Sequence, residues 1–465
     1  MMHLGLFIAG EGHHIAAWRD PASPDIVANQ DIGHYIELAQ KGERALFDFL
    51  FTADTNAVFY GDEIAQWCQT TQALRLEPLT LLAALAVATS HIGLVCTATT
   101  TYLEPFHVAR LFASLDQISH GRAGWNLVTS SAPAEAANFS APAHPPAAER
   151  YARAAEFADV VLGLWDSWEE DAITADKQSG LYFDPDKLHR LDHKGEHFHV
   201  RGPMTIRRSD QGRPIIVAAG QSEEGRALAG ATAEVVFSVQ QDMEEARAYC
   251  QDIKARAVKC GRIADAVKVM PGLMPVLGAS AKEAEEKLQR IQDFIHPELG
   301  IQRLSSILGT DLSGFDLDGP LPDLAEGLEQ PGRQQVVIQM ARRENLTIRQ
   351  LYERVVGIRA HRVVAGTAEE IADDMEAWHK AGAATRKAST ILLKASFPSC
   401  RRAACSAPNM RGALCGKISA YRSPPTATRR RGGLRRSARC KPHRVMISRN
   451  HEPRKKSGPR PLRRQ

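Results

Sequence analysis

The stretch Thr97–Ser131, TATTTYLEPFHVARLFASLDQISHGRAGWNLVTSS, predicts a strand, a helix and a second strand in succession. The first strand begins with apolar residues that precede this stretch. It ends in the threonines with which the stretch opens. A helix is predicted over Pro105–Ile118, because proline suits its first turn and apolar residues recur on one face. The second strand begins at Ala123 and ends in Thr129-Ser130-Ser131. Hydroxyl groups therefore gather at two strand ends, which is where parallel β/α folds bind ligands.

The same alternation of strand and helix continues along the chain. The predicted strands are Leu4–Ala9, Phe49–Ala53, Ile92–Thr99, Ala123–Thr129, Pro214–Gly220, Val235–Val239 and Val267–Leu277, with an eighth near residues 390–395. The predicted helices are Ile26–Ala45, Pro78–Ala88, Pro105–Ile118, Ala148–Leu164, Glu223–Ala231, Asp242–Lys259 and Ala281–Phe294. This pattern favours an α/β fold, a closed (β/α)8 TIM barrel with insertions, over an open doubly wound sheet. The first strand end, AGEGHH, also lacks the G-x-G-x-x-G spacing of a dinucleotide fold.

The composition is that of a soluble globular protein, with 465 residues, 44% of them hydrophobic and 24% charged. No apolar run is long enough to span a membrane, and the first residues lack the features of a signal peptide. The eight cysteines have no framework spacing, which predicts reduced thiols. We therefore expect a cytoplasmic protein without membrane contact.

The net charge of +4 conceals two regions of opposite sign. Residues 385–465 hold 17 Arg and 6 Lys against the single acid Glu452, a net charge of +22, so residues 1–384 carry −18. We predict that residues 1–384 form the barrel, with insertions at about 165–212 and 297–350 that are candidate substrate lids. The basic tail could bind nucleic acid through its phosphates, but Tyr421 is its only aromatic residue after Phe397. Since base stacking needs such residues, a disordered tail is favoured over nucleic-acid binding.

Seven motifs occur in order along the first four-fifths of the chain. They are GEGHH, FTADT, LEPLTLLAALA, TATTTY, SHGRAGWNLVTS, ERYARAAEF and AAGQSEEGR. This ordered set resembles the bacterial-luciferase-like flavin monooxygenases, in the branch of the nitrilotriacetate, dibenzothiophene-sulfone and pristinamycin synthase enzymes. The resemblance implies a luciferase-like TIM barrel that is the oxygenating part of a two-component system. A separate flavin reductase would supply reduced FMN, and the enzyme would be a homodimer.

In that family, reduced FMN reacts with molecular oxygen to give a flavin C4a-peroxide, which oxidises a small organic substrate. The protein must then provide a dry cleft and hold both molecules, since the cofactor carries the difficult chemistry. The resemblance places Asp54 against the isoalloxazine edge or ribityl chain. Thr97, Thr99 and Ser130 are short hydroxyl groups suited to the polar atoms of the flavin. An N-cap role for Asp54 and plain β-propensity for the threonines are the alternatives.

The FMN phosphate is predicted to bind where a helix begins at Ser222, because free N–H groups and a hydroxyl form an anion site. The same serine could simply cap the helix. The family pattern adds the phenol of Tyr151. The family often has a histidine four residues before this tyrosine, where Ala147 stands here; His144 lies seven residues before it and cannot simply replace it. Arg150 is predicted to be a charge on the helix surface.

His13, at the end of the first strand, resembles the family's substrate-side histidine, and we predict a catalytic role for it, with a structural histidine as the alternative. Two other functions are open. One is a deazaflavin-dependent oxidoreductase on the same barrel. The other is a metal-dependent TIM-barrel hydrolase, suggested by a group of histidines: His189, His193, His197 and His199. The family has a hairpin in this segment, so we predict no metal site.

The tail also invites a hypothesis about its origin. The family ends in a helix that this chain does not match in frame. Residues Arg401–Tyr421 can be back-translated with permitted codons so that another reading frame resembles that closing helix. The tail is therefore predicted to be frameshifted or disordered, with the closing helix of the barrel missing.

Overall fold

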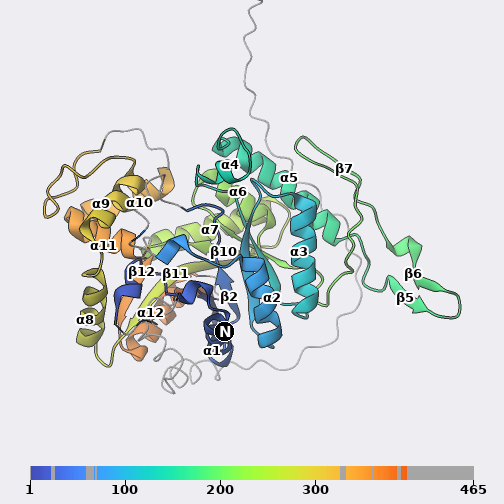
Figure 1. Ribbon diagram of the computed structural model, residues 1–465, viewed down its shortest axis with the longest axis horizontal. Helices are drawn as coiled ribbons and strands as arrows, with labels where there is room; N and C mark the ends of the chain where they lie inside the picture. Colours follow the sequence, from blue (N-terminus) through green and yellow to red (C-terminus); the bar gives the residue numbers. More distant parts are fainter. Residues whose placement is uncertain are drawn as a thin grey trace, which may run out of the picture.

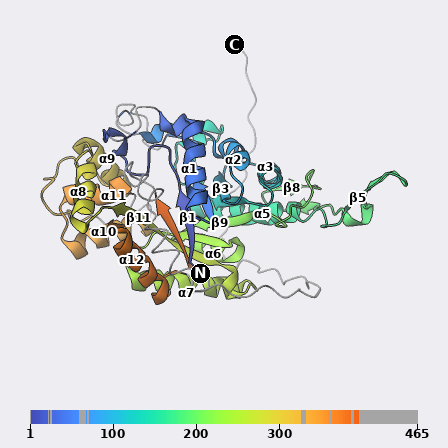
Figure 2. The same ribbon diagram turned by 90° about the horizontal axis from the view of Figure 1, so that it is seen from below.

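The computed structural model describes residues 2–21, 23, 27–58, 68, 71–324, 331–358, 361–384 and 389–394. Strands form its centre and helices surround them (Figures 1 and 2). No helix of this described part is long and apolar enough to cross a membrane. Residues 395–465, which include nearly all of the expected basic tail, lie outside the described residues.

Eight parallel strands pair with one another in a closed ring. Strand β10 completes the ring because it pairs with both β9 and β11. The eight strands are β1 (Met2–Phe7), β2 (Phe49–Thr52), β3 (Gly93–Thr99), β4 (Ala123–Val128), β9 (Ile215–Ala219), β10 (Val235–Ser238), β11 (Lys268–Leu277) and β13 (Ser389–Lys394). This parallel ring agrees with the barrel that the alternating sequence pattern predicts, and its eighth strand lies where one was expected.

The inside of the ring is filled by apolar side chains. They form one cluster: Phe7, Phe49, Phe51, Val95, Val217, Val235 and Met270. Neighbouring residues such as Leu50 and Leu94 point outward and are fully buried beneath the helices, because side chains alternate along a strand. Since the interior is packed, a ligand site can form only at an end of the barrel.

The surrounding helices begin at clear local signals. Pro78 and Pro105 occupy the first turns of α2 and α3, and the side chain of Asp242 accepts hydrogen bonds from two N–H groups of α7. The helix predicted from residue 26 begins instead at Ile32, because Asp31 caps it. The helices are α1 (Ile32–Arg44), α2 (Pro78–Ala88), α3 (Pro105–Ile118), α5 (Ala147–Trp165), α6 (Glu223–Thr232), α7 (Met243–Lys259) and α8 (Ala281–Gln292).

One further strand and helix, β12 (Arg362–Gly366) and α12 (Ala368–Ala381), were not predicted. Strand β12 lies outside the ring and pairs with β11 alone, and most of its residues are only half-buried. It therefore lacks the long apolar run of a ring strand. Helix α12 packs Ile371 and Met375 against Leu4 and Leu273, and so covers the ring beside the first strand.

The first insertion, residues 165–212, lies on the outside of the barrel. It contains two small hairpins, formed by β5 (Ile173–Asp176) with β6 (Leu181–Phe183) and by β7 (His193–Lys194) with β8 (His199–Val200), and β5 and β6 project far from the barrel (Figures 1 and 2). The remainder contacts the outer faces of α3 and α5; for example, Glu156 of α5 accepts a hydrogen bond from His193.

The lid role predicted for this first insertion is therefore wrong. Helix α5 carries the chain back to the amino-terminal side of the ring before the insertion begins. Gln211, near the end of the insertion, bonds Asp116 at the last turn of α3 and the carbonyl of Ala123, where β4 starts. The insertion thus ends at the amino-terminal side of the strands.

The second insertion forms a separate helical group beside the barrel (Figure 1). It contains α9 (Pro297–Leu308), α10 (Pro331–Glu344) and α11 (Ile348–Ile358). These helices share an apolar cluster with Ile15 and Ala16, which lie in the loop after β1. Because that loop leaves the carboxyl end of a ring strand, the group lies next to the end of the barrel where a site is expected. Its lid role stays a prediction.

The start of α12 offers a direct test of how this helix is stabilised. Thr367 and Glu370 form a reciprocal capping box, in which each side chain bonds the backbone N–H of the other residue. We expect Thr367→Ala to lower the free energy of unfolding by about 1 kcal/mol, because one helix N–H loses its acceptor. Thr367→Ser keeps the hydroxyl and should remain close to wild type in denaturant unfolding. Equal losses in both variants would contradict the capping role.

Candidate active site

A cavity of about 370 Å³ opens at the carboxyl ends of β2, β3, β4 and β9. This volume is in the range of small-molecule sites, which is roughly 300–1,000 Å³. Five of the seven residues predicted for the site line it: Asp54, Thr97, Thr99, Ser130 and Tyr151. Ser222 lies at its border, with its hydroxyl 3.4 Å from the phenol oxygen of Tyr151. The strand ends thus bring together residues that lie far apart in the sequence.

Thr97 and Asn126 form a polar pair inside the ring. The side-chain N–H of Asn126 donates to the Thr97 hydroxyl oxygen over 2.8 Å, so the hydroxyl proton of Thr97 is available to donate elsewhere. The other side-chain atom of Asn126, its Oδ1, is buried and has no hydrogen-bond partner. A buried acceptor without a donor is costly. Of this pair, Thr97 lines the cavity, and its hydroxyl can therefore donate to a ligand acceptor there.

A chain of hydrogen bonds crosses the cavity wall from Thr99 through Ser130 to Glu135. The two hydroxyl oxygens lie 2.8 Å apart, and Ser130 lies 2.8 Å from Oε2 of Glu135, which also accepts from the side chain of Asn56. An ionised carboxylate can only accept, so Ser130 donates to Glu135 and Thr99 donates to Ser130. The lone pair left on Ser130 can then accept from a ligand hydroxyl.

The sequence analysis did not identify Glu135. It is the first residue of the short helix α4 (Glu135–Asn138), it is buried, and it lines the cavity. An isolated glutamate five residues after Ser130 has no pattern that marks it as functional. Only the folding of α4 back over the strand ends brings its carboxylate to Ser130 and Asn56.

Asp54 is the cavity group that titrates near neutral pH. Its pKa is raised to about 6, mainly by burial and in small part by the negative charges of Glu77 and Glu135, against the opposing effects of the Thr55 N–H and Arg75. Asp54 lies two residues after β2 and lines the cavity. It can hold or release a proton there in the pH range in which enzymes work.

The predicted phosphate site has the expected local geometry. Ser222 caps α6 and accepts a hydrogen bond of 3.1 Å from the N–H of Gly225, so the alternative N-cap role is confirmed, while the phosphate role stays a prediction. Gly225 lines the cavity, and a Cβ at this position would lie 3.1 Å from the Tyr151 phenol oxygen and from Cα of Gly220. The absence of a side chain therefore lets a ligand approach the first turn of α6 closely.

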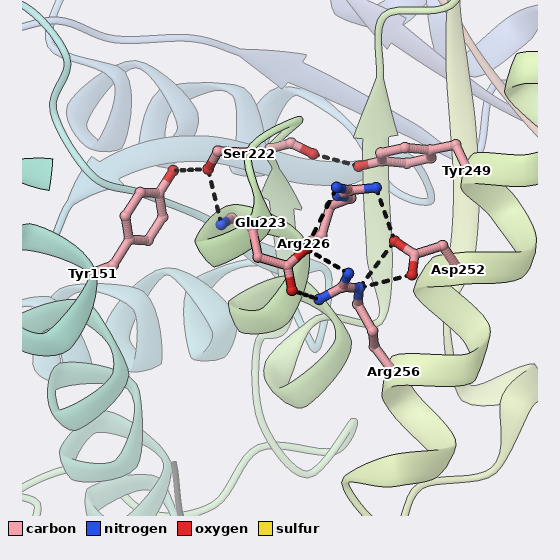
Figure 3. A network of polar contacts seen from close by, with 9 residues as sticks. Tyr151, Ser222, Glu223, Arg226, Tyr249, Asp252 and Arg256 are labelled. Atoms are coloured by element: carbon pink, nitrogen blue, oxygen red, sulfur yellow. Dashed lines mark hydrogen bonds and ion pairs between the residues drawn. The ribbon is translucent and has the colours of Figure 1, made fainter. Parts of the chain in front are cut away.

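A network of ion pairs fixes α6 to α7 behind this site (Figure 3). Arg256 of α7 binds Glu223, directly after Ser222, at 2.6 Å and also binds Asp252 at 2.9 Å. The Tyr249 hydroxyl donates to the carbonyl of Gly220 over 2.5 Å, and burial raises the pKa of this phenol. The turn before α6 is thus held from the side away from the cavity.

His13 lies outside the set of residues that line the cavity. Its Nε2 is 3.0 Å from the carbonyl of Phe7, and its ring contacts the ring of Phe7 at a centroid distance of 4.1 Å. The neighbouring His14 is fully buried beside Gly357 of α11, and burial lowers its pKa to about 3. His14 is therefore neutral at ordinary pH. The catalytic role of His13 stays a prediction.

Arg150 differs from its expected place on the helix surface, since it lines the cavity. The reason is its position in the first turn of α5, immediately before Tyr151, on the side that meets the strand ends. Ala147 is the first residue of the same helix. His144, which precedes α5, contacts the guanidinium of Arg150 and thus reaches the site through that side chain.

Asp54 gives the folded protein a specific pH dependence. Its pKa is raised from 3.8 to about 6, so the folded chain keeps a proton that the unfolded chain loses in this interval. The stability of the wild type should therefore fall relative to Asp54→Asn as the pH rises from about 4 to 6, by up to about 3 kcal/mol. Denaturant unfolding of both proteins between pH 4 and 8 measures this difference. Parallel stability profiles would contradict the raised pKa.

Comparisons with known proteins agree with this geometry. Residues 9–385 match the family model of the luciferase-like monooxygenases. The chain is 47% identical to N-acetyl-S-(2-succino)cysteine monooxygenase of Bacillus subtilis over 81% of its own length and 84% of the relative. It is also 47% identical to nitrilotriacetate monooxygenase component A of Aminobacter aminovorans, over 81% and 85%.

The solved structure of riboflavin lyase RcaE, with modified FMN and riboflavin, superimposes with a TM-score of 0.74 at 30% identity and covers 90% of this chain and 96% of its own. The family match spans most of the chain and includes the cavity at the strand ends. The order of motifs, the parallel ring and these similarities together show that the chain belongs to the luciferase-like monooxygenase family and is a flavin-dependent monooxygenase.

Proposed function

We propose that this protein is the oxygenating component of a two-component system that uses reduced FMN from a separate flavin reductase. When bound, reduced FMN supplies the activation of molecular oxygen from which one atom enters a small organic substrate. Support for a separate reductase comes from the name of the relative called component A. The metal-dependent hydrolase is set aside because the chain belongs to the monooxygenase family.

The residues of the cavity fit FMN in their donors and acceptors. The hydroxyl of Thr97, which lines the cavity, can give a proton to an acceptor on the polar edge of a flavin ring. Ser130 presents an acceptor for a ribityl hydroxyl. Ser222 and Tyr151 bring two hydroxyl groups to the first turn of α6 at the cavity border, where Gly225 leaves room for a ligand, and this juxtaposition is the observation that carries the proposal.

Each residue of the cavity then has its own role. Thr97, Ser130 and Tyr151 would orient the cofactor at the strand ends through hydrogen bonds, while Asp54 can hold or release a proton at its carboxyl oxygen in the same cavity. The apolar cluster that includes Phe51 and Val95 closes the ring beneath the cavity and excludes water from that side. We propose that His13 orients the substrate, and that the enzyme works as a homodimer.

The decisive experiment is a titration of the protein with FMN, followed by fluorescence. We expect Ser222→Ala to weaken FMN binding by about tenfold, because it removes one hydrogen bond to a charged phosphate. Ser280→Ala is the matched control, since Ser280 caps α8 by the same serine geometry but does not line the cavity. It should lose a similar helix cap and keep the FMN affinity of the wild type.

Activity is then measured as oxygen uptake with a flavin reductase, NADH and FMN. A substrate from a screen of small organic compounds should raise oxygen uptake and lower the yield of hydrogen peroxide. Binding of a deazaflavin cofactor in place of FMN would favour the other oxidoreductase considered above. Equal FMN affinity in wild type and Ser222→Ala would contradict the assigned phosphate site.

A further inference from the structure

Arg150 brings a cation to the wall of the cavity. Its side chain lines the cavity together with Tyr151 and Gly225, and its Nε is buried with no hydrogen-bond partner among the residues that the structure describes. Among the described residues, no carboxylate forms an ion pair with it. A guanidinium stays charged and has five donors. An unpaired buried donor on such a group is costly, so the site is incomplete without an anion.

The side chain of His144 contacts this guanidinium and fixes its position. Nη1 of Arg150 contacts Nε2 of His144, and Nδ1 of His144 lies 2.6 Å from the hydroxyl of Tyr102. Arginine can only donate, so Nε2 of His144 must accept and its proton must sit on Nδ1, from which it bonds Tyr102. Burial and the charge of Arg150 lower the pKa of His144, in keeping with a neutral ring. The ring of Tyr102 in turn stacks on Phe139 at 5.0 Å.

The neighbouring polar groups are neutral, so they lack the positive charge that Arg150 supplies. Ser222 and Tyr151 offer a hydroxyl and a phenol, the N–H of Gly225 is already bound by the Ser222 hydroxyl, and two acidic residues follow Ser222 at the start of α6. One of them, Glu223, is bound by Arg256. A phosphate monoester carries about two negative charges near neutral pH. Without a further cation, the cradle would have only neutral groups to hold that charge.

We propose that Arg150 is the cationic half of the cofactor's phosphate site, and that His144 is the positioning residue that holds its guanidinium. This inference rests on the proposed function, because it assigns the anion to FMN. It explains how a histidine seven residues before Tyr151 can still serve the site. His144 acts through the guanidinium of Arg150 and does not need to reach the phosphate itself. The site thereby selects the phosphorylated flavin over riboflavin.

The test compares the dissociation constants of FMN and riboflavin, which differ only by the phosphate. We expect Arg150→Met to weaken FMN binding by about 10- to 100-fold and to leave riboflavin binding unchanged. Arg150→Lys keeps the charge and should retain part of the preference for FMN. Arg153→Met is the matched control on the same helix, because Arg153 bonds the carbonyls of Thr100 and Leu103 and lies over the ring of Phe198. It should leave the ratio of the two constants unchanged.

Variants of His144 test the positioning role. His144→Ala should weaken FMN binding several-fold without affecting riboflavin, whereas His144→Gln offers Arg150 an acceptor and should restore most of the affinity. Circular dichroism shows whether each variant is folded, and Arg150→Lys keeps the test decisive if Arg150→Met does not fold. An equal loss of FMN and riboflavin affinity, or no loss of either, would overturn the assignment of Arg150.

The outcomes separate this inference from the proposed function. If the wild type binds FMN, and Ser222→Ala weakens that binding while Arg150→Met leaves the FMN-to-riboflavin ratio unchanged, only the role of Arg150 is wrong. If the wild type binds neither flavin, the proposed function fails, and the present assignment fails with it.

Discussion

The parallel pairing of eight strands in a closed ring is the constraint on which the site depends. Parallel strands place all their carboxyl ends on one side, so Asp54, Thr97 and Ser130 meet although they lie at the ends of three different strands. The register is equally important. Thr97 pairs with Asn126 across β3 and β4, and a shift by one residue would turn one of the two side chains away from the ring.

Buried residues fix which partner donates in the hydrogen bonds along the cavity wall. Glu135 can only accept, and this fixes the proton of Ser130 and then that of Thr99. Arg150 can only donate, and this fixes the tautomer of His144. Each wall of the cavity therefore has a defined polarity before any ligand binds. Such preorganisation lowers the cost of orienting a cofactor, because the polar groups need not rearrange.

Much of the fold and part of the site could be predicted from sequence. The strand and helix predictions succeeded where local signals are strong, as at Pro78 and Pro105, and the strand-end rule selected residues that do line one cavity. Glu135 and Arg150 were missed because their importance comes from contacts made only after folding. The lid prediction for residues 165–212 failed because insertion length says nothing about which end of the barrel the segment meets.

The sequence by itself determined the alternation of strands and helices, the family and the hydroxyl groups at the strand ends, because these follow from local periodicity and ordered motifs. Tertiary structure alone decided which charges share a cavity. His144 and Arg150 contact each other only because the chain turns at the start of α5, and Tyr102 reaches them from the loop after β3. Burial and electrostatic coupling depend on distances through space, and a linear chain does not specify those distances until its hydrophobic core has formed.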